Sequence, residues 1–236
     1  MQTTAAIPSL TPRHRRSPLW LRIGFWICTA IAVAVVIRRA VALAFPRPSA
    51  APQLAALDAL FASHAALTFA HILPALAFVL VAPFVVFRRS SRAERLIYLL
   101  GAIVGVTAYP MSVHSVGGWT ERSAVLFFNS LFLFSLLRAY LLGREGDWQR
   151  SRTWLLRAIA VLLGIATTRP VMGMFFATSR LTHLTPAQFF GIAFWIGFSV
   201  NTLVFELWLR SRSRQQGDIS MHTVESYDRT HIRRIP

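Results

Sequence analysis

The sequence predicts an all-α membrane protein, a polytopic bundle of six transmembrane helices with both termini in the cytoplasm. Hydrophobic residues fill 55% of the 236 positions and charged residues only 14%, whereas soluble domains carry about 25% charged residues. Several apolar runs approach the roughly 20 residues that a helix needs to cross a hydrocarbon core of about 30 Å. The arginines also gather on one side of these runs, which is the pattern that sets membrane orientation.

Six spans account for the apolar runs, and the short connections between them predict antiparallel neighbours. Their approximate limits are 19–37, 64–87, 96–113, 123–142, 154–176 and 187–209. The transmembrane domain then occupies residues 19–210, after a basic cytoplasmic tail of residues 1–18. The polar residues 211–236 are expected to form a disordered cytoplasmic tail.

The distribution of arginine fixes the orientation. All 25 basic residues are arginine, which is typical of a GC-rich bacterial genome and so indicates a bacterial inner membrane. With the N-terminus inside, 19 of them fall on the cytoplasmic side and 5 on the outer side, while Arg169 lies within a span. This bias predicts that both termini are cytoplasmic.

The first span has an alternative interpretation. The basic tail, the apolar run and the segment Ala42-Leu43-Ala44 together resemble a cleavable signal peptide. Arg38 and Arg39 lie between the apolar run and that cut site, which favours a retained helix. The span also holds Cys28, the only cysteine, so no intramolecular disulfide is expected.

The second span carries polar residues on one face. His64, Thr68 and His71 have the spacing i, i+4, i+7, which places them on the same side of a helix. Pro74 and Pro83 follow, and each is expected to bend the helix and to free a backbone carbonyl that a neighbour must satisfy.

The third and fourth spans contain packing and turn signals. Gly101 and Gly105 form a G-x-x-x-G pattern, which predicts close packing against another helix of the chain. His114 closes the third span on the outer side. Gly117-Gly118 predicts the turn into the fourth span.

The fifth span contains the most informative residue, Arg169. It lies 12 residues beyond Arg157, or roughly 18 Å along a helix, at a depth similar to that of His71 in the antiparallel second span. A cation at this depth costs a few kcal/mol and is expected to face a bundle interior, a partner or a water-filled cavity. Pro170 follows directly and should bend the helix there.

These residues predict a polar cavity in the outer half of the bundle, lined by His71, Arg169, His114 and His64. A guanidinium beside neutral imidazoles suits an anionic group, so the cavity is expected to bind or pass a small anionic ligand. One alternative is a redox protein that holds haem b between His71 and His114. His64 and His71 are about 10 Å apart along one helix, too far to share a metal. Another alternative is a non-catalytic scaffold subunit whose polar residues only join helices.

The inner half carries a second polar set. Arg157 and Glu206 have similar depths, and an ion pair between them is the simplest way to tolerate both. The alternative for Glu206 is proton or ion coupling. Asn201 is expected to hydrogen-bond another helix, and Trp154 to pack at the start of the fifth span.

The remaining patterns limit the function classes. No P-loop, G-x-G-x-x-G, H-E-x-x-H or G-x-S-x-G motif is found, so enzymatic activity is not expected. No arginine stripe interleaved with aromatics indicates nucleic-acid binding. Arg210, Arg212 and Arg214 follow the last span and are expected to contact anionic lipid headgroups, or to act only as a topology signal.

Three stretches carry a resemblance to a known family: a histidine-bearing span before a basic loop, a loop before an arginine-bearing span, and a final Asn-to-Glu segment. They are His71-Ile72 with Ala82-Pro83 and Arg88-Arg89, then Gly146-Asp147 with Arg152, Trp154, Arg157 and Arg169, then residues 201–206. Over about 64–210 the chain resembles the bacterial multi-pass membrane proteins catalogued as domain of unknown function 2306. It is divergent, because Glu94-Arg95 and Ser151 stand where the family tends to carry histidine. The resemblance implies the fold and ligand-facing residues, not a reaction.

Overall fold

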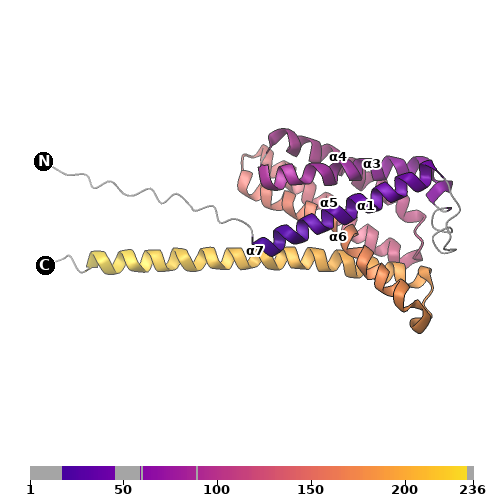
Figure 1. Ribbon diagram of the computed structural model, residues 1–236. Helices are drawn as coiled ribbons and strands as arrows, with labels where there is room; N and C mark the ends of the chain where they lie inside the picture. The colour runs from indigo at the N-terminus through magenta and orange to yellow at the C-terminus, as the bar shows by residue number, and fades with distance from the viewer. Residues whose placement is uncertain (1–17, 46–58, 60, 89, 233–236) are drawn as a thin grey trace.

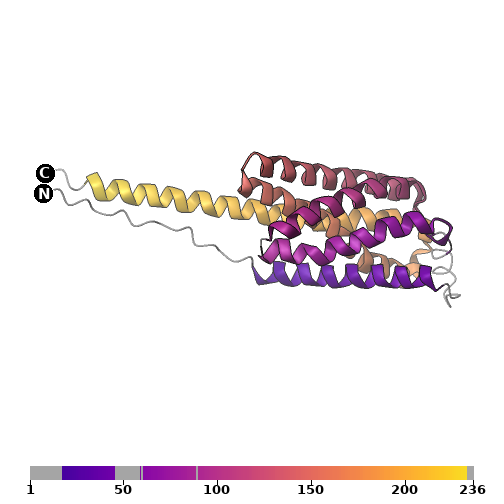
Figure 2. The same ribbon diagram turned by 90° about the horizontal axis from the view of Figure 1, so that it is seen from above.

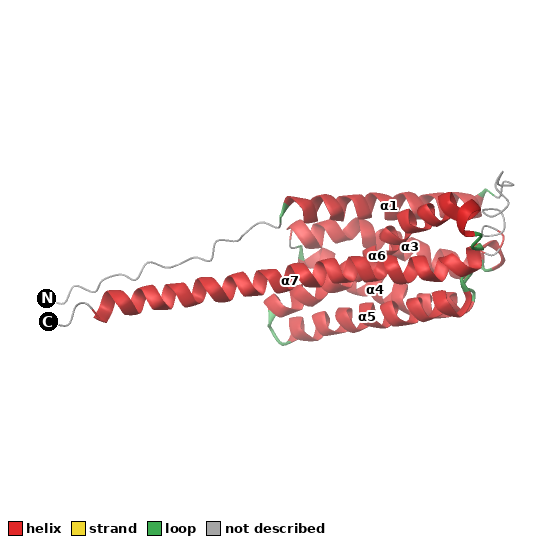
Figure 3. Cartoon of the chain, turned by 90° about the horizontal axis from the view of Figure 1, so that it is seen from below, coloured by secondary structure: helices red, strands yellow, loops and turns green. Residues whose placement is uncertain are grey.

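The computed structural model describes residues 18–45, 59, 61–88 and 90–232, with the backbone alone at 179, 180, 182, 186 and 213–232. Over these residues the chain is helical and contains no strand (Figure 3). The elements are α1 (Leu19–Ala44), α3 (Ala65–Pro83), the π-helix η1 (Phe84–Arg88), α4 (Ser91–Val113), α5 (Gly118–Arg144), α6 (Trp148–Thr182) and α7 (Pro186–Ile232). Within these described residues, six helical segments are long and apolar enough to cross a membrane. The chain is therefore a multi-pass helical membrane protein, as the sequence predicts.

The helices lie side by side as a bundle (Figures 1 and 2). α3 packs between α1 and α4, α4 packs on α5, and α6 contacts α1, α5 and α7. We call the end where α1, α4 and α6 finish and α3, α5 and α7 begin the outer end, following the predicted orientation. The start of α1 and the long extension of α7 lie at the opposite end (Figure 1), as expected for an even number of spans.

Several helices extend beyond their predicted spans, and two of these extensions, in α1 and α5, carry charged residues into the bundle. α1 continues beyond position 37 to Ala44, because Val and Ala follow the two arginines and keep the helix hydrogen-bonded as far as the Phe45 N–H, which donates to the Val41 carbonyl at 2.9 Å. Arg38 and Arg39 are thus helical. α5 begins at Gly118 rather than at 123, which includes Glu121.

The end of the chain also differs from expectation. α7 continues to Ile232 and projects away from the bundle (Figure 1), where a disordered tail is predicted from residue 211. This segment has no proline and one glycine, so nothing in it breaks the helix that the last span begins. Residues 1–17, which include the predicted basic tail, lie outside the described part of the chain.

The second proline of α3 is followed by a change of helix type. Pro83 ends the α-helix, and the chain continues as the π-helix η1. The guanidinium of Arg152 on α6 donates from Nη2 to the Val86 carbonyl at 2.8 Å. A neighbouring helix therefore satisfies a backbone carbonyl at the end of η1. This is not the carbonyl that Pro83 frees, which lies four residues before the proline, at Val79.

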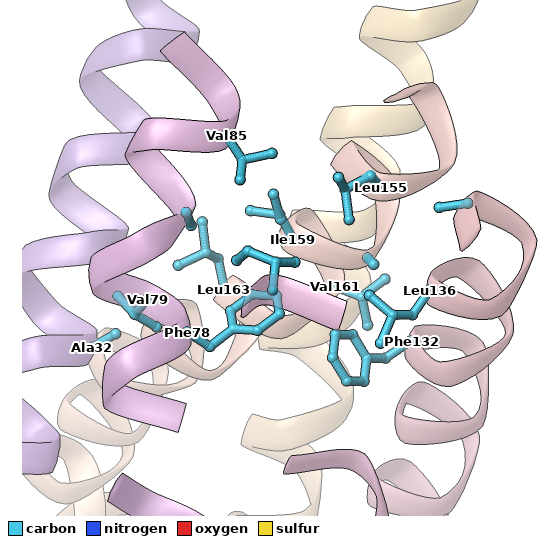
Figure 4. Close-up of a cluster of buried hydrophobic side chains, with 14 of the residues drawn as sticks. Ala32, Phe78, Val79, Val85, Phe132, Leu136, Leu155, Ile159, Val161 and Leu163 are labelled. Carbon is cyan, nitrogen blue, oxygen red and sulfur yellow. The ribbon is translucent and has the colours of Figure 1, made fainter. Parts of the chain in front are cut away.

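The core lies between α3, α5 and α6. Phe78, Phe132, Leu155 and Ile159 point toward one another from these helices (Figure 4) and are at most 4% exposed. Because lipid is as apolar as these side chains, close packing rather than water exclusion holds such helices together.

Glycines permit the closest helix contacts. A Cβ built on Gly197 of α7 would lie 2.6 Å from the Thr168 backbone nitrogen of α6, and one on Gly101 of α4 would lie 2.7 Å from a Leu136 methyl group of α5. The predicted packing role of Gly101 within the chain is therefore confirmed.

We expect Gly197→Ala to lower the free energy of unfolding by about 1–3 kcal/mol, because α6 and α7 must separate to accept the methyl group. Gly24→Ala is the matched control, since a Cβ there meets nothing within 4 Å. Thermal unfolding in detergent should show a lower melting temperature for the first variant alone. Equal melting temperatures would show that this contact is not tight.

Candidate functional site

A cavity of about 500 Å³ opens within the bundle and is lined by residues of all six spans. This volume falls in the range of about 300–1,000 Å³ that is typical of small-molecule sites. Along α6 its lining extends from Val161 to Phe176, and along α5 from Phe132 to Glu121. The cavity therefore reaches from mid-bundle to the outer end.

Arg169 of α6 lines this cavity. Among the described residues, its guanidinium has one hydrogen bond, from Nη1 to the Met172 sulfur at 3.7 Å, and its buried Nε has no partner. A thioether is a weak acceptor. The charge thus faces the cavity, and no oxygen of a described residue hydrogen-bonds it.

Glu121 is the acidic residue of the lining, and the sequence analysis missed it. The residue is 8% exposed, and its carboxylate accepts a hydrogen bond from the Gly117 N–H at 2.6 Å, at the positive N-terminal end of α5. It interacts electrostatically with Arg169, but no salt bridge joins these two described side chains. The sequence did offer a signal, because Glu121 lies just before the predicted start of the fourth span. The predicted limit at 123 left it outside that span.

His71 of α3 lines the cavity with one edge of its ring bonded elsewhere. Its Nδ1 lies 3.0 Å from the Thr107 hydroxyl of α4, and that hydroxyl donates to the Ile103 carbonyl at 2.7 Å. With its hydrogen used, the hydroxyl accepts from Nδ1–H, which assigns the proton to Nδ1. The Nε2 atom is then left without a proton and can accept a hydrogen bond.

The two remaining predicted histidines pair with each other. The rings of His64 and His114 are 3.7 Å apart between centroids. His114 lines the main cavity, whereas His64 lines a small adjoining pocket and its Nδ1 lies 2.9 Å from the Ser63 hydroxyl. The structure thus brings His71, His114 and Arg169 to one cavity and places His64 beside it. No group of three His, Cys, Asp or Glu suited to a metal ion is found among the described residues.

Two further arginines line the cavity, although the sequence analysis placed them on the outer side beyond the first span. Arg38 and Arg39 reach it from the last turns of α1. The guanidinium carbon of Arg39 lies 4.0 Å from the centre of the Phe61 ring, a cation–π contact. The side chains of Arg38 and Arg39 also have other interactions. Arg169, whose buried Nε has no partner, is therefore the arginine on which we base the site.

The inner polar set matches its prediction. Arg157 donates from Nε and Nη2 to the two carboxylate oxygens of Glu206, and its guanidinium carbon lies 4.4 Å from the centre of the Trp154 ring. The amide of Asn201 donates to the Ala160 carbonyl of α6 at 2.6 Å. These contacts confirm the ion pair and the interhelical bond.

Comparisons with known proteins add no relative. No family model matches the chain, and no curated protein or solved structure matches it. The resemblance to the family of domain of unknown function 2306 therefore stays a prediction, and the function must be argued from the cavity itself.

Proposed function

We propose that this protein binds a small anionic ligand in its outer-half cavity, and that it resides in a bacterial inner membrane. The observation that carries the proposal is Arg169, a guanidinium that faces a cavity of about 500 Å³ with a buried Nε that has no partner. A positive charge at membrane depth costs about 2.5–3.5 kcal/mol on insertion scales. A ligand anion supplies the partner that the bundle leaves out.

The chemistry around Arg169 suits a carboxylate or phosphate group. Guanidinium binds both groups through two parallel hydrogen bonds, and such charged hydrogen bonds are about twice as strong as neutral ones. Glu121 already accepts the Gly117 N–H and forms no salt bridge with Arg169. The guanidinium of Arg169 is therefore available to a ligand. The negative charge of Glu121 offsets part of the positive charge of Arg169 without forming a salt bridge.

The location follows from the arginine distribution. The arginine-rich side faces the cytoplasm, so the cavity opens toward the outside. Below the last span, Arg210 and Arg212 are exposed, and the Arg212 guanidinium lies 4.9 Å from the centre of the Trp208 ring. An arginine beside an interfacial tryptophan supports contact with anionic headgroups. The side chain of Arg214, the third predicted lipid contact, lies outside the described part of the structure.

A panel of acetate, benzoate and inorganic phosphate tests the proposal by thermal unfolding of the purified protein. A bound anion at 100 times its dissociation constant should add about 2.7 kcal/mol to the stability of the wild type. Arg169→Met should abolish this gain. Arg122→Met is the matched control, because Arg122 lies at the outer end of α5 with a buried unpartnered Nε but does not line the cavity. Stabilisation that survives in Arg169→Met would contradict the proposal.

Haem b is the second candidate, favoured by the presence of both His71 and His114 in one cavity lining. An axial pair of imidazoles would give the purified protein a Soret absorbance band, and His71→Ala should remove it. His183→Ala is the control, since His183 is exposed and does not line the cavity. A spectrum with no such band after expression with a haem precursor would eliminate this candidate.

A further inference from the structure

We infer that the ligand is a single-chain amphiphile, whose anionic head binds Arg169 and whose apolar chain extends from there toward the membrane centre. This inference rests on the proposed anion site and specifies the class of molecule that the site accepts. It comes from the polarity of the cavity wall on the two sides of Arg169.

Arg169 divides the cavity into a charged outer part and an apolar inner part. On α6 the lining continues inward from Arg169 through Ile165 and Leu162 to Val161. Arg169 and Val161 are eight positions apart, which corresponds to about 12 Å along the helix. His71 stands at the same level, eight residues before Val79 on α3. All charged lining residues lie at or beyond this level.

Aromatic side chains form much of the inner wall. Phe128 and Phe198 stack with their ring centres 5.2 Å apart, and Phe194 lies 5.9 Å from Phe198. The polar group among them, the Asn129 amide, donates one hydrogen bond to the Gly105 carbonyl of α4 at 2.9 Å. The inner part therefore offers surface to an alkyl chain and little to a polar ligand.

A small polar anion would fill only the outer part. Apolar cavities do not hold ordered water, and an unfilled cavity forfeits the packing contacts of its wall. A chain attached to the anionic head fills the inner part and restores these contacts. A volume of about 500 Å³ suits one chain with its head.

The test compares butanoate with dodecanoate, each titrated into the full-length protein in lipid nanodiscs and measured by thermal unfolding. Dodecanol and dodecyl phosphate test the role of the head group. Dodecanol, which is uncharged, is expected to bind about tenfold more weakly than dodecanoate or dodecyl phosphate. Val161→Phe reduces the inner part of the cavity. It should weaken dodecanoate binding about tenfold while leaving butanoate binding unchanged. Val106→Phe is the control, because Val106 is 63% exposed on the outside of α4.

A second measurement does not depend on the folding of any variant. Dodecanoate with a photoreactive diazirine at the end of its chain should label wild-type peptides that contain Phe128, Phe132 or Val161. Labelling confined to exposed residues such as Val106, or dodecanoate binding that Val161→Phe leaves intact, would contradict the inference that the ligand is an amphiphile. If butanoate still binds in that case, the proposed anion site is retained. If neither butanoate nor dodecanoate binds, the proposed function fails as well.

Discussion

Arg169→Met is expected to make the ligand-free protein more stable by about 1–3 kcal/mol. Methionine fills a volume similar to that of the arginine stem but carries no charge, so the substitution removes the cost of a sheltered guanidinium whose Nε has no partner. Most substitutions within a bundle destabilise it, so a gain here marks a residue kept for binding rather than for folding.

Chemical and thermal unfolding of the purified variant in detergent would measure this gain. Arg169→Lys provides the comparison, because it keeps the charge in the cavity and should show no gain. A loss of more than about 1 kcal/mol in Arg169→Met would contradict the argument, since it would assign Arg169 a structural partner and support the scaffold alternative.

Glu206→Gln is expected to lower stability by about 2 kcal/mol. The substitution leaves the Arg157 guanidinium without its anionic partner in a region where both side chains are mostly enclosed, at 27% and 29% exposure. Breaking a fully buried pair costs about 3–5 kcal/mol, and the partial exposure here reduces that cost.

Arg157→Met in the same protein should recover part of the loss. The double variant has neither charge. Its loss of unfolding free energy should therefore be smaller than the summed losses of the two single variants by about 1 kcal/mol or more. Additive losses would show that the two groups are not coupled. Recovery should be incomplete, because Arg157→Met, alone or in the double variant, also removes the cation–π contact between the guanidinium and the Trp154 ring at 4.4 Å.

The number of helices and the inner ion pair were predictable because each depends on position along one axis. Apolar run length gives the spans, and antiparallel order places Arg157 and Glu206 at matching depth. The same reasoning brought His71 and Arg169 to one level of the bundle, where both line the cavity.

The cavity lining was only partly predictable, because it depends on where helices end. Charged residues at the edges of the apolar runs were left outside the predicted spans, yet α1 and α5 carry Arg38, Arg39 and Glu121 into the bundle. The pairing of His64 with His114 depends on how α3 and α4 lie against each other at their outer ends. Periodicity along a single helix carries no information about either feature.

Equilibrium dialysis of radiolabelled butanoate against the wild type, Arg169→Met and Arg122→Met tests the anion site most directly. We predict saturable binding to the wild type, binding about tenfold weaker or absent in Arg169→Met, and no change in Arg122→Met, because one charged hydrogen-bonded partner is worth about 1.5–3 kcal/mol. Equal affinity in the wild type and Arg169→Met would contradict the account, since the anion would then not depend on the guanidinium in the cavity.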